Sequence, residues 1–143
     1  MKTQRQLLDA WLQRKSSGPF FRLRETKLVE FEYKGPRFGH PSNYAKVRFQ
    51  CDPGDELRLA ARIDWPVGLP PDYCDALVMA IGNGVVEAAM GQEYPYRGCT
   101  MTLIAISWDD VSSSELAFYR AAKAATEDLV RMRAEWVYVR PAE

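Results

Sequence analysis

Histidine and cysteine, which supply many metal ligands and catalytic groups, are scarce in this chain. Its 143 residues include one histidine, His40, and three cysteines, Cys51, Cys74 and Cys99. The cysteine spacing matches no zinc-ligand pattern, and an odd number of widely spaced cysteines argues against a disulfide framework. A hydrolase triad needs a histidine beside a nucleophile, whereas His40 lies before a proline with no nucleophile motif nearby. We therefore expect no catalytic residues, no metal, no cofactor and a reducing, cytoplasmic setting.

Phosphate-binding loops and long apolar runs are also missing. No GxxxxGK[ST] run occurs, so we expect neither a GTPase domain nor GTP binding. Residues 82–84, Gly-Asn-Gly, lack the Lys-Ser/Thr ending of such a loop, and we interpret them as allowing close packing of a helix on a sheet. No apolar stretch approaches the roughly 18–20 residues of a membrane span, and the N-terminal residues lack the apolar core of a signal peptide. We expect no membrane association.

The net charge of zero hides an asymmetry along the chain. Residues 1–62 contain 13 Lys and Arg against 7 Asp and Glu, which gives +6, whereas residues 63–143 contain 6 against 12, which gives −6. A neutral chain is a poor general nucleic-acid binder, although a locally basic face can still bind RNA. Alternatively, folding interleaves the two halves and the asymmetry disappears.

Hydrophobic periodicity predicts an N-terminal helix over residues 3–15. An apolar stripe formed by Leu7, Leu8, Trp11 and Leu12 is surrounded by polar residues. The run Ser-Ser-Gly-Pro ends this helix. We therefore divide the chain into a helix within residues 1–18 and one domain over residues 19–143.

Alternation of apolar and polar residues predicts the sheet. One long, half-exposed strand begins at residue 20, and strands over 45–51 and 56–65 are joined by Asp-Pro-Gly-Asp, which predicts a hairpin. The exposed face of that hairpin carries Lys46, Arg48, Arg58 and Arg62, mixed with Glu56 and Asp64.

The rest of the chain predicts two helices and two strands. The helices span residues 72–90 and 113–131, a buried strand spans 98–107, and a short strand ends the domain. The fold class is α+β, a sheet with helices on one face.

The junction before the second of these helices reads SWDDVSSSELAF, residues 107–118. Ser112 followed three residues later by Glu115 matches a capping box, in which the serine caps the helix and the glutamate reaches back to the cap. Acidic residues beside a helix N-terminus are favoured by the helix dipole. The serines and acids therefore need no catalytic explanation, and we predict that the helix starts at Ser112 or Ser113.

The same run resembles SYHDVDSSELAF in domain IV of elongation factor G and its ribosomal-protection relatives. The register extends back without a gap to Tyr94-Pro95, and forward through an alanine-rich helix to VYVRP. Arg24-Glu25-Thr26 and Asn43-Tyr44-Ala45-Lys46-Val47 resemble weaker family motifs that occur in the same order. The resemblance covers about residues 20–141.

This resemblance implies a four-stranded sheet with two helices and a left-handed β-α-β crossover. In the family, domain IV is the arm that enters the decoding site of the ribosome, and its tip corresponds here to residues 35–43 and 107–112. This sequence departs from the family at Asp109, which replaces a histidine, and in the first tip loop, which keeps only Gly35 and Gly39 as glycines.

Three functions are possible, and the lowest-ranked, an enzyme on this fold, has no constellation of catalytic residues to support it. The first is a non-enzymatic ribosome- or RNA-associated protein in translation, whose contacts lie at the tip and the adjacent strand. Trp108 stacks on a base in this hypothesis, or else packs in the core, which is the commoner fate of such a tryptophan. The second is an interaction module that lost the RNA role and forms a homo-oligomer through the N-terminal helix. Asp109 and the neutral net charge favour this second hypothesis. The RNA-binding candidates are Arg37, His40, Asn43, Lys46, Arg48, Trp108 and Asp109.

Overall fold

The computed structural model of the protein describes residues 18–34, 44–65, 67–108 and 113–140. The predicted helix over residues 3–15 and the first predicted tip loop lie outside these residues. In chain order the elements are β1 (Phe20–Leu23), β2 (Lys27–Lys34), β3 (Tyr44–Pro53), β4 (Arg58–Ala61), α2 (Pro71–Met90), β5 (Cys99–Ser107), α3 (Glu115–Arg131), a 3-10 turn (Arg133–Glu135) and β6 (Trp136–Val139).

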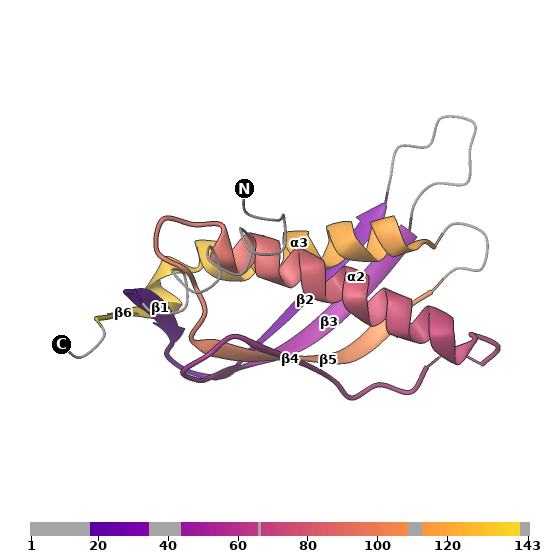
Figure 1. The fold of residues 1–143 in the computed structure, drawn as a ribbon, viewed down its shortest axis with the longest axis horizontal. Helices are drawn as coiled ribbons and strands as arrows, with labels where there is room; N and C mark the ends of the chain where they lie inside the picture. Colours follow the sequence, from indigo (N-terminus) through magenta and orange to yellow (C-terminus); the bar gives the residue numbers. More distant parts are fainter. Residues whose placement is uncertain (1–17, 35–43, 66, 109–112, 141–143) are drawn as a thin grey trace, which may run out of the picture.

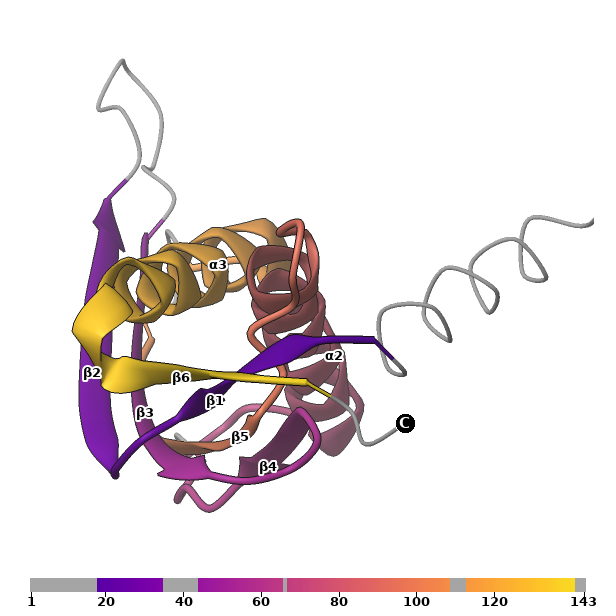
Figure 2. The same ribbon diagram turned by 90° about the vertical axis from the view of Figure 1, so that its left-hand side faces the viewer.

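The main sheet has four strands in the order β2-β3-β5-β4. Strand β3 pairs antiparallel with both β2 and β5, and β4 pairs parallel with β5, the two being connected through α2. Both helices cover one face of this sheet, and β1 and β6 form a separate antiparallel pair at one end (Figures 1 and 2). The predicted α+β class, with two helices on one face of a four-stranded sheet, is confirmed.

The core lies between this face and the helices. Alternate residues of β3 and β5, such as Phe49 and Met101, are buried there against Leu77 and Ile81 of α2 and Phe118 of α3. The other residues of β5 are half-buried or exposed, so the predicted buried strand is fully buried on one face only. All three cysteines are buried and free, as their apolar surroundings predict.

Helix α2 is long and apolar enough to cross a membrane by length and composition alone. Its buried residues face the core, and a core helix of a soluble protein meets the same criteria. The predicted absence of membrane association and the cytoplasmic location remain predictions.

The predicted hairpin over residues 45–65 is wrong. Strand β3 does not pair with β4, because β5 lies between them and pairs with both. The predicted turn over residues 52–55 is also displaced, because Asp52 and Pro53 belong to β3 and the chain bends at Asp55 and Glu56.

The predicted long strand from residue 20 is also wrong, because it breaks at Arg24–Thr26. Strand β1 pairs with β6, and the Arg24 amide donates to the Glu135 carbonyl at 2.8 Å. Strand β2 then begins again at Lys27 and pairs with β3. One alternating segment therefore serves two sheets.

The predicted capping box is replaced by a simpler cap two residues later. Helix α3 begins at Glu115, and the Ser114 hydroxyl accepts a hydrogen bond from the Ala117 amide at 3.1 Å. Glu115 is thus the first helical residue, not the third, so it cannot complete a box with Ser112, which lies outside the described residues. The nearby Ser113 hydroxyl is used elsewhere, donating to the Tyr44 carbonyl.

Candidate nucleic-acid interface

The residues that flank the two predicted tip segments lie at the same end of the domain. Strand β2 ends at Lys34 and β3 begins at Tyr44, opposite Lys34, while β5 ends at Ser107, opposite Lys46. This end lies away from the β1-β6 pair (Figure 1). The antiparallel pairing of β2, β3 and β5 therefore brings together the residues that flank 35–43 and 109–112.

A hydrogen bond joins the residues that flank these two segments. The Ser113 hydroxyl donates to the Tyr44 carbonyl at 2.8 Å, which ties the start of α3 to the start of β3. The Tyr44 hydroxyl donates to a Glu32 carboxylate oxygen at 3.1 Å, across the β2-β3 pair. Burial and this carboxylate raise the pKa of Tyr44, so its hydroxyl keeps its proton and remains a donor.

Lys46 and Arg48 lie on the face of the sheet opposite the helices, because they alternate with buried residues of β3. Both are directed to one carboxylate, at 3.0 Å from the Lys46 ammonium to Glu30 and 3.9 Å from the Arg48 Nε to Glu30. The hydrogen bond with Glu30 raises the pKa of Lys46, so the lysine stays charged. Glu32 lies opposite Lys46 in the register and pairs with Lys34, so this face carries three cations and two acids.

Two further cations that sequence reasoning missed lie near this end. Lys34 pairs with Glu32 at 3.0 Å, and Arg120 of α3 donates to the Tyr33 hydroxyl at 2.9 Å. Arg120 is distant in sequence from the strands, and no local pattern marks it. Its position follows only from the packing of α3 beside β2.

Few ion pairs in the described part of the chain join its two halves. Among the residues that the structure describes, Lys27 with Glu135 is the one ion pair that joins the two halves, at 3.1 Å. The other ion pairs lie within one half. The interleaving that would cancel the asymmetry is therefore not achieved through ion pairs.

The indole of Trp108 packs within a group of aromatic rings. It stacks on Phe118 with ring centroids 5.9 Å apart and an interplanar angle of 11°, and it meets Tyr73 edge-on at 5.3 Å. The side chain is half-buried beside the core. Of the two predicted roles, the structure supports core packing, since a base would have to compete with Phe118 for the same ring face.

The remaining candidates, Arg37, His40, Asn43 and Asp109, lie outside the described residues. The structure therefore brings Lys46, Arg48 and Trp108 to the same end of the domain and leaves the other four predictions as they stand.

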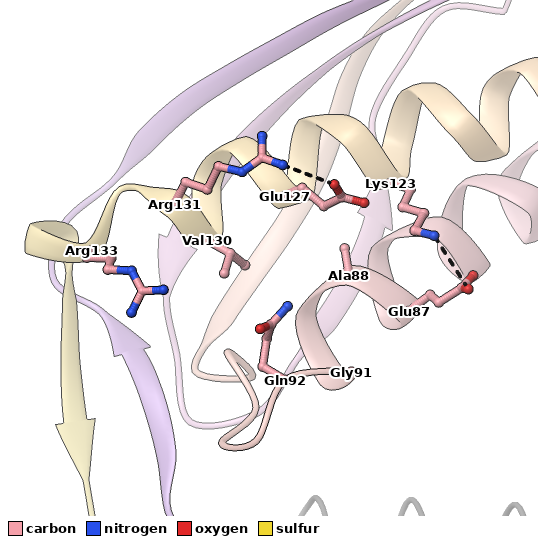
Figure 3. A pocket seen from close by; sticks show the side chains of 9 residues that line it. All are labelled: Glu87, Ala88, Gly91, Gln92, Lys123, Glu127, Val130, Arg131 and Arg133. Carbon is pink, nitrogen blue, oxygen red and sulfur yellow. Dashed lines mark hydrogen bonds and ion pairs between the residues drawn. The ribbon is translucent and has the colours of Figure 1, made fainter.

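Away from this end of the domain, a concave region lies between the C-terminal halves of α2 and α3, with a volume of about 500 Å³ (Figure 3). Four of its five charged groups form ion pairs, with Lys123 at 3.7 Å from Glu87 and Arg131 at 3.4 Å from Glu127. Glu87 also accepts from the Tyr119 hydroxyl, which raises the pKa of Tyr119. In the part of the chain that the structure describes, no group of three or more His, Cys, Asp or Glu is placed to hold a metal ion.

Comparison with known proteins gives a structural likeness. No family model and no curated protein matches the chain. It is similar to the crystal structure of ttk003000868 from Thermus thermophilus, with a TM-score of 0.69 and 26% identity. The likeness covers 85% of this chain but 18% of the Thermus chain, so the fold forms a small part of that much longer protein.

Proposed function

We propose that this protein is a non-enzymatic ribosome- or RNA-associated protein that uses the fold of elongation factor G domain IV, including its left-handed crossover, as an RNA-contacting arm. The observation that carries the proposal is the Ser113–Tyr44 hydrogen bond, which holds the bases of both tip segments together. A tip made of two segments can contact RNA as one unit only if their bases are fixed to each other.

The Thermus likeness supports the same proposal. A fold that occupies 18% of a longer chain occurs there as one part among several. Domain IV has that relation to elongation factor G. The present chain has no phosphate-binding loop, so its contacts with the ribosome would not depend on GTP.

The charges near the tip favour RNA phosphate as the ligand. On the face of the sheet opposite the helices, three cations, Lys34, Lys46 and Arg48, lie beside two acids, Glu30 and Glu32, which leaves one surplus positive charge. Arg120 of α3 adds a cation at the same end of the domain, beside the Tyr33 hydroxyl. Phosphate contacts of this kind position a protein on nucleic acid without reading its sequence. The expected binding is therefore salt-dependent and tolerant of sequence.

Co-sedimentation of the full chain with ribosomes at two salt concentrations tests this function. The double variant Lys46→Ala/Arg48→Ala should weaken binding and lower the salt slope by about one unit for each phosphate that is no longer neutralised. Asp109→His should strengthen binding, because it removes a negative charge from the tip. Arg58→Ala is the matched control, since Arg58 is an exposed cation on the far edge strand of the same sheet, paired with Glu56 at 3.5 Å.

One observation favours the alternative, a homo-oligomeric interaction module. Glu30 already partners both Lys46 and Arg48, and such pairing is also what a surface without a nucleic-acid ligand shows. Two results together would favour this alternative over the first function. Ribosome binding would be unchanged by salt and by all of these variants, and light scattering would give the mass of a dimer.

A further inference from the structure

An apolar groove lies along the outer side of α2, where this helix meets the edge strand β4. The groove has a volume of about 240 Å³ and is lined by Leu57 and Leu59 on one side and by Met79, Gly82 and Val86 on the other. Gly82 lets the helix approach closely, since a Cβ there would lie 3.2 Å from the Leu59 side chain. Met79 is 67% exposed and Val86 is 38% exposed, so apolar surface remains open to solvent along the groove.

The described chain begins beside this groove. The guanidinium of Arg97 donates both to the Gly18 carbonyl, at 3.4 Å, and to the Asp55 carbonyl, at 2.9 Å. Arg97 is itself buried and lies 3.8 Å above the Phe20 ring, which fixes the bridge. Residues 1–17 therefore join the domain beside Asp55, two residues before Leu57 at one end of the groove.

The length and pattern of residues 1–17 match the groove. A helix over residues 3–15 is about 20 Å long at 1.5 Å per residue, similar to the stretch of α2 from Asp75 to Val86. In such a helix Leu7, Leu8, Trp11 and Leu12 form one apolar face, and faces of this kind are stable when buried against another element.

The charges at the two ends are complementary. Residues 1–17 contain four basic residues, two near each end, and a single acid. At the Gly18 end of the groove lie Asp55 and Glu56, which are exposed and already pair with Arg22 at 3.3 Å and with Arg58 at 3.5 Å. At the far end Asp72 and Asp75 occupy the first turns of α2. A segment that runs from Gly18 along the groove brings basic residues to acids at both ends.

We propose that residues 3–15 dock as an amphipathic helix into the α2-β4 groove of the same chain, with the Leu7, Leu8, Trp11 and Leu12 stripe covering Met79 and Val86. Docking within one chain is favoured because a short linker, residues 16–18, holds the segment at a millimolar effective concentration beside its site. The docked helix also covers the free edge of β4, which otherwise offers unpaired backbone groups to another strand.

A double-mutant cycle in the full chain tests the docking. Trp11→Ala and Met79→Ala should each raise the unfolding equilibrium constant, measured by urea titration. If the two side chains are in contact, the increase in the double variant should be about fivefold smaller than the product of the two single increases. Trp11→Ala with Leu28→Ala is the control cycle, because Leu28 is a 56% exposed leucine on the opposite face of the sheet. That control should be multiplicative within a factor of about two.

Amide hydrogen exchange gives a second, independent readout. Residues 3–15 should be protected in the unmodified chain, and Met79→Asp should speed their exchange at least tenfold while Leu28→Asp leaves it unchanged. Light scattering should give the mass of a monomer. Docking within the chain would be overturned by any of three results. These are purely multiplicative effects of Trp11→Ala and Met79→Ala, exchange of residues 3–15 at the rate of an unfolded chain, and coupling that occurs only in a dimer.

Discussion

Replacing Gly84 by alanine tests the closest contact between the two helices. A Cβ at Gly84 would lie 2.5 Å from the Tyr119 carbonyl oxygen and 2.9 Å from the Lys123 amide nitrogen, both backbone atoms of α3. Neither atom can move without shifting the helix. Because α2 and α3 share much of the core, a shift of one helix disturbs the packing of buried residues such as Val85 and Ala122.

Two opposing effects set the magnitude. Alanine in a helix interior is favoured over glycine by about 0.5–1 kcal/mol, whereas overpacking a tight contact costs about 1–3 kcal/mol. At Gly84 the contact is with backbone, so the upper part of that range applies and we expect a net loss of about 2 kcal/mol. Gly82→Ala is the matched control two residues away, because its Cβ would meet only the end of the Leu59 side chain, at 3.2 Å.

Urea unfolding followed by circular dichroism measures both variants. With a slope of about 1–3 kcal/mol per molar urea, the Gly84→Ala midpoint should fall by about 1 M, while that of Gly82→Ala should stay or rise. An alanine at residue 84 that leaves the midpoint unchanged or raises it would refute the close approach of the two helices.

The α3 cap and the buried thiols give two further tests. Ser114→Ala should lower the free energy of unfolding by about 1 kcal/mol because the cap is removed, whereas Ser112→Ala should leave it unchanged. If urea titrations show that Ser112→Ala lowers it as much as Ser114→Ala does, the assignment of the cap to Ser114 is wrong. Burial raises the pKa of Cys51 and of Cys99 from 9.0 to about 12, so these thiols should react with a disulfide reagent at pH 8 only after unfolding. Because the unfolded thiols ionise first, their contribution to stability is present below pH 9 and is lost as the pH rises from 9 towards 12; rapid labelling of the folded chain, or stability that is constant over this range, contradicts the burial.

Local sequence patterns predicted elements well and their partners poorly. Helix α2 and strand β5 fall within a residue of the expected spans, because a long apolar run with clear breakers specifies its own limits. The hairpin failed because nothing in residues 45–65 shows that β5, almost forty residues later in the chain, inserts between the two strands. Strand pairing depends on residues distant in sequence, and alternation alone does not encode it.

The same limit applies to the candidate site. The alternation of β3 correctly predicted that Lys46 and Arg48 face away from the core, but not that Glu30 lies between them, because that contact depends on the β2-β3 register. The helix start was misplaced because three consecutive serines offer equivalent caps in the sequence. In the structure Ser114 caps the helix, and the Ser113 hydroxyl donates to the Tyr44 carbonyl, which is distant in sequence. The hydrogen bond that joins the residues flanking the two tip segments therefore lies directly before the α3 cap at Ser114, so a substitution at Ser113 should disturb the helix start and the tip together.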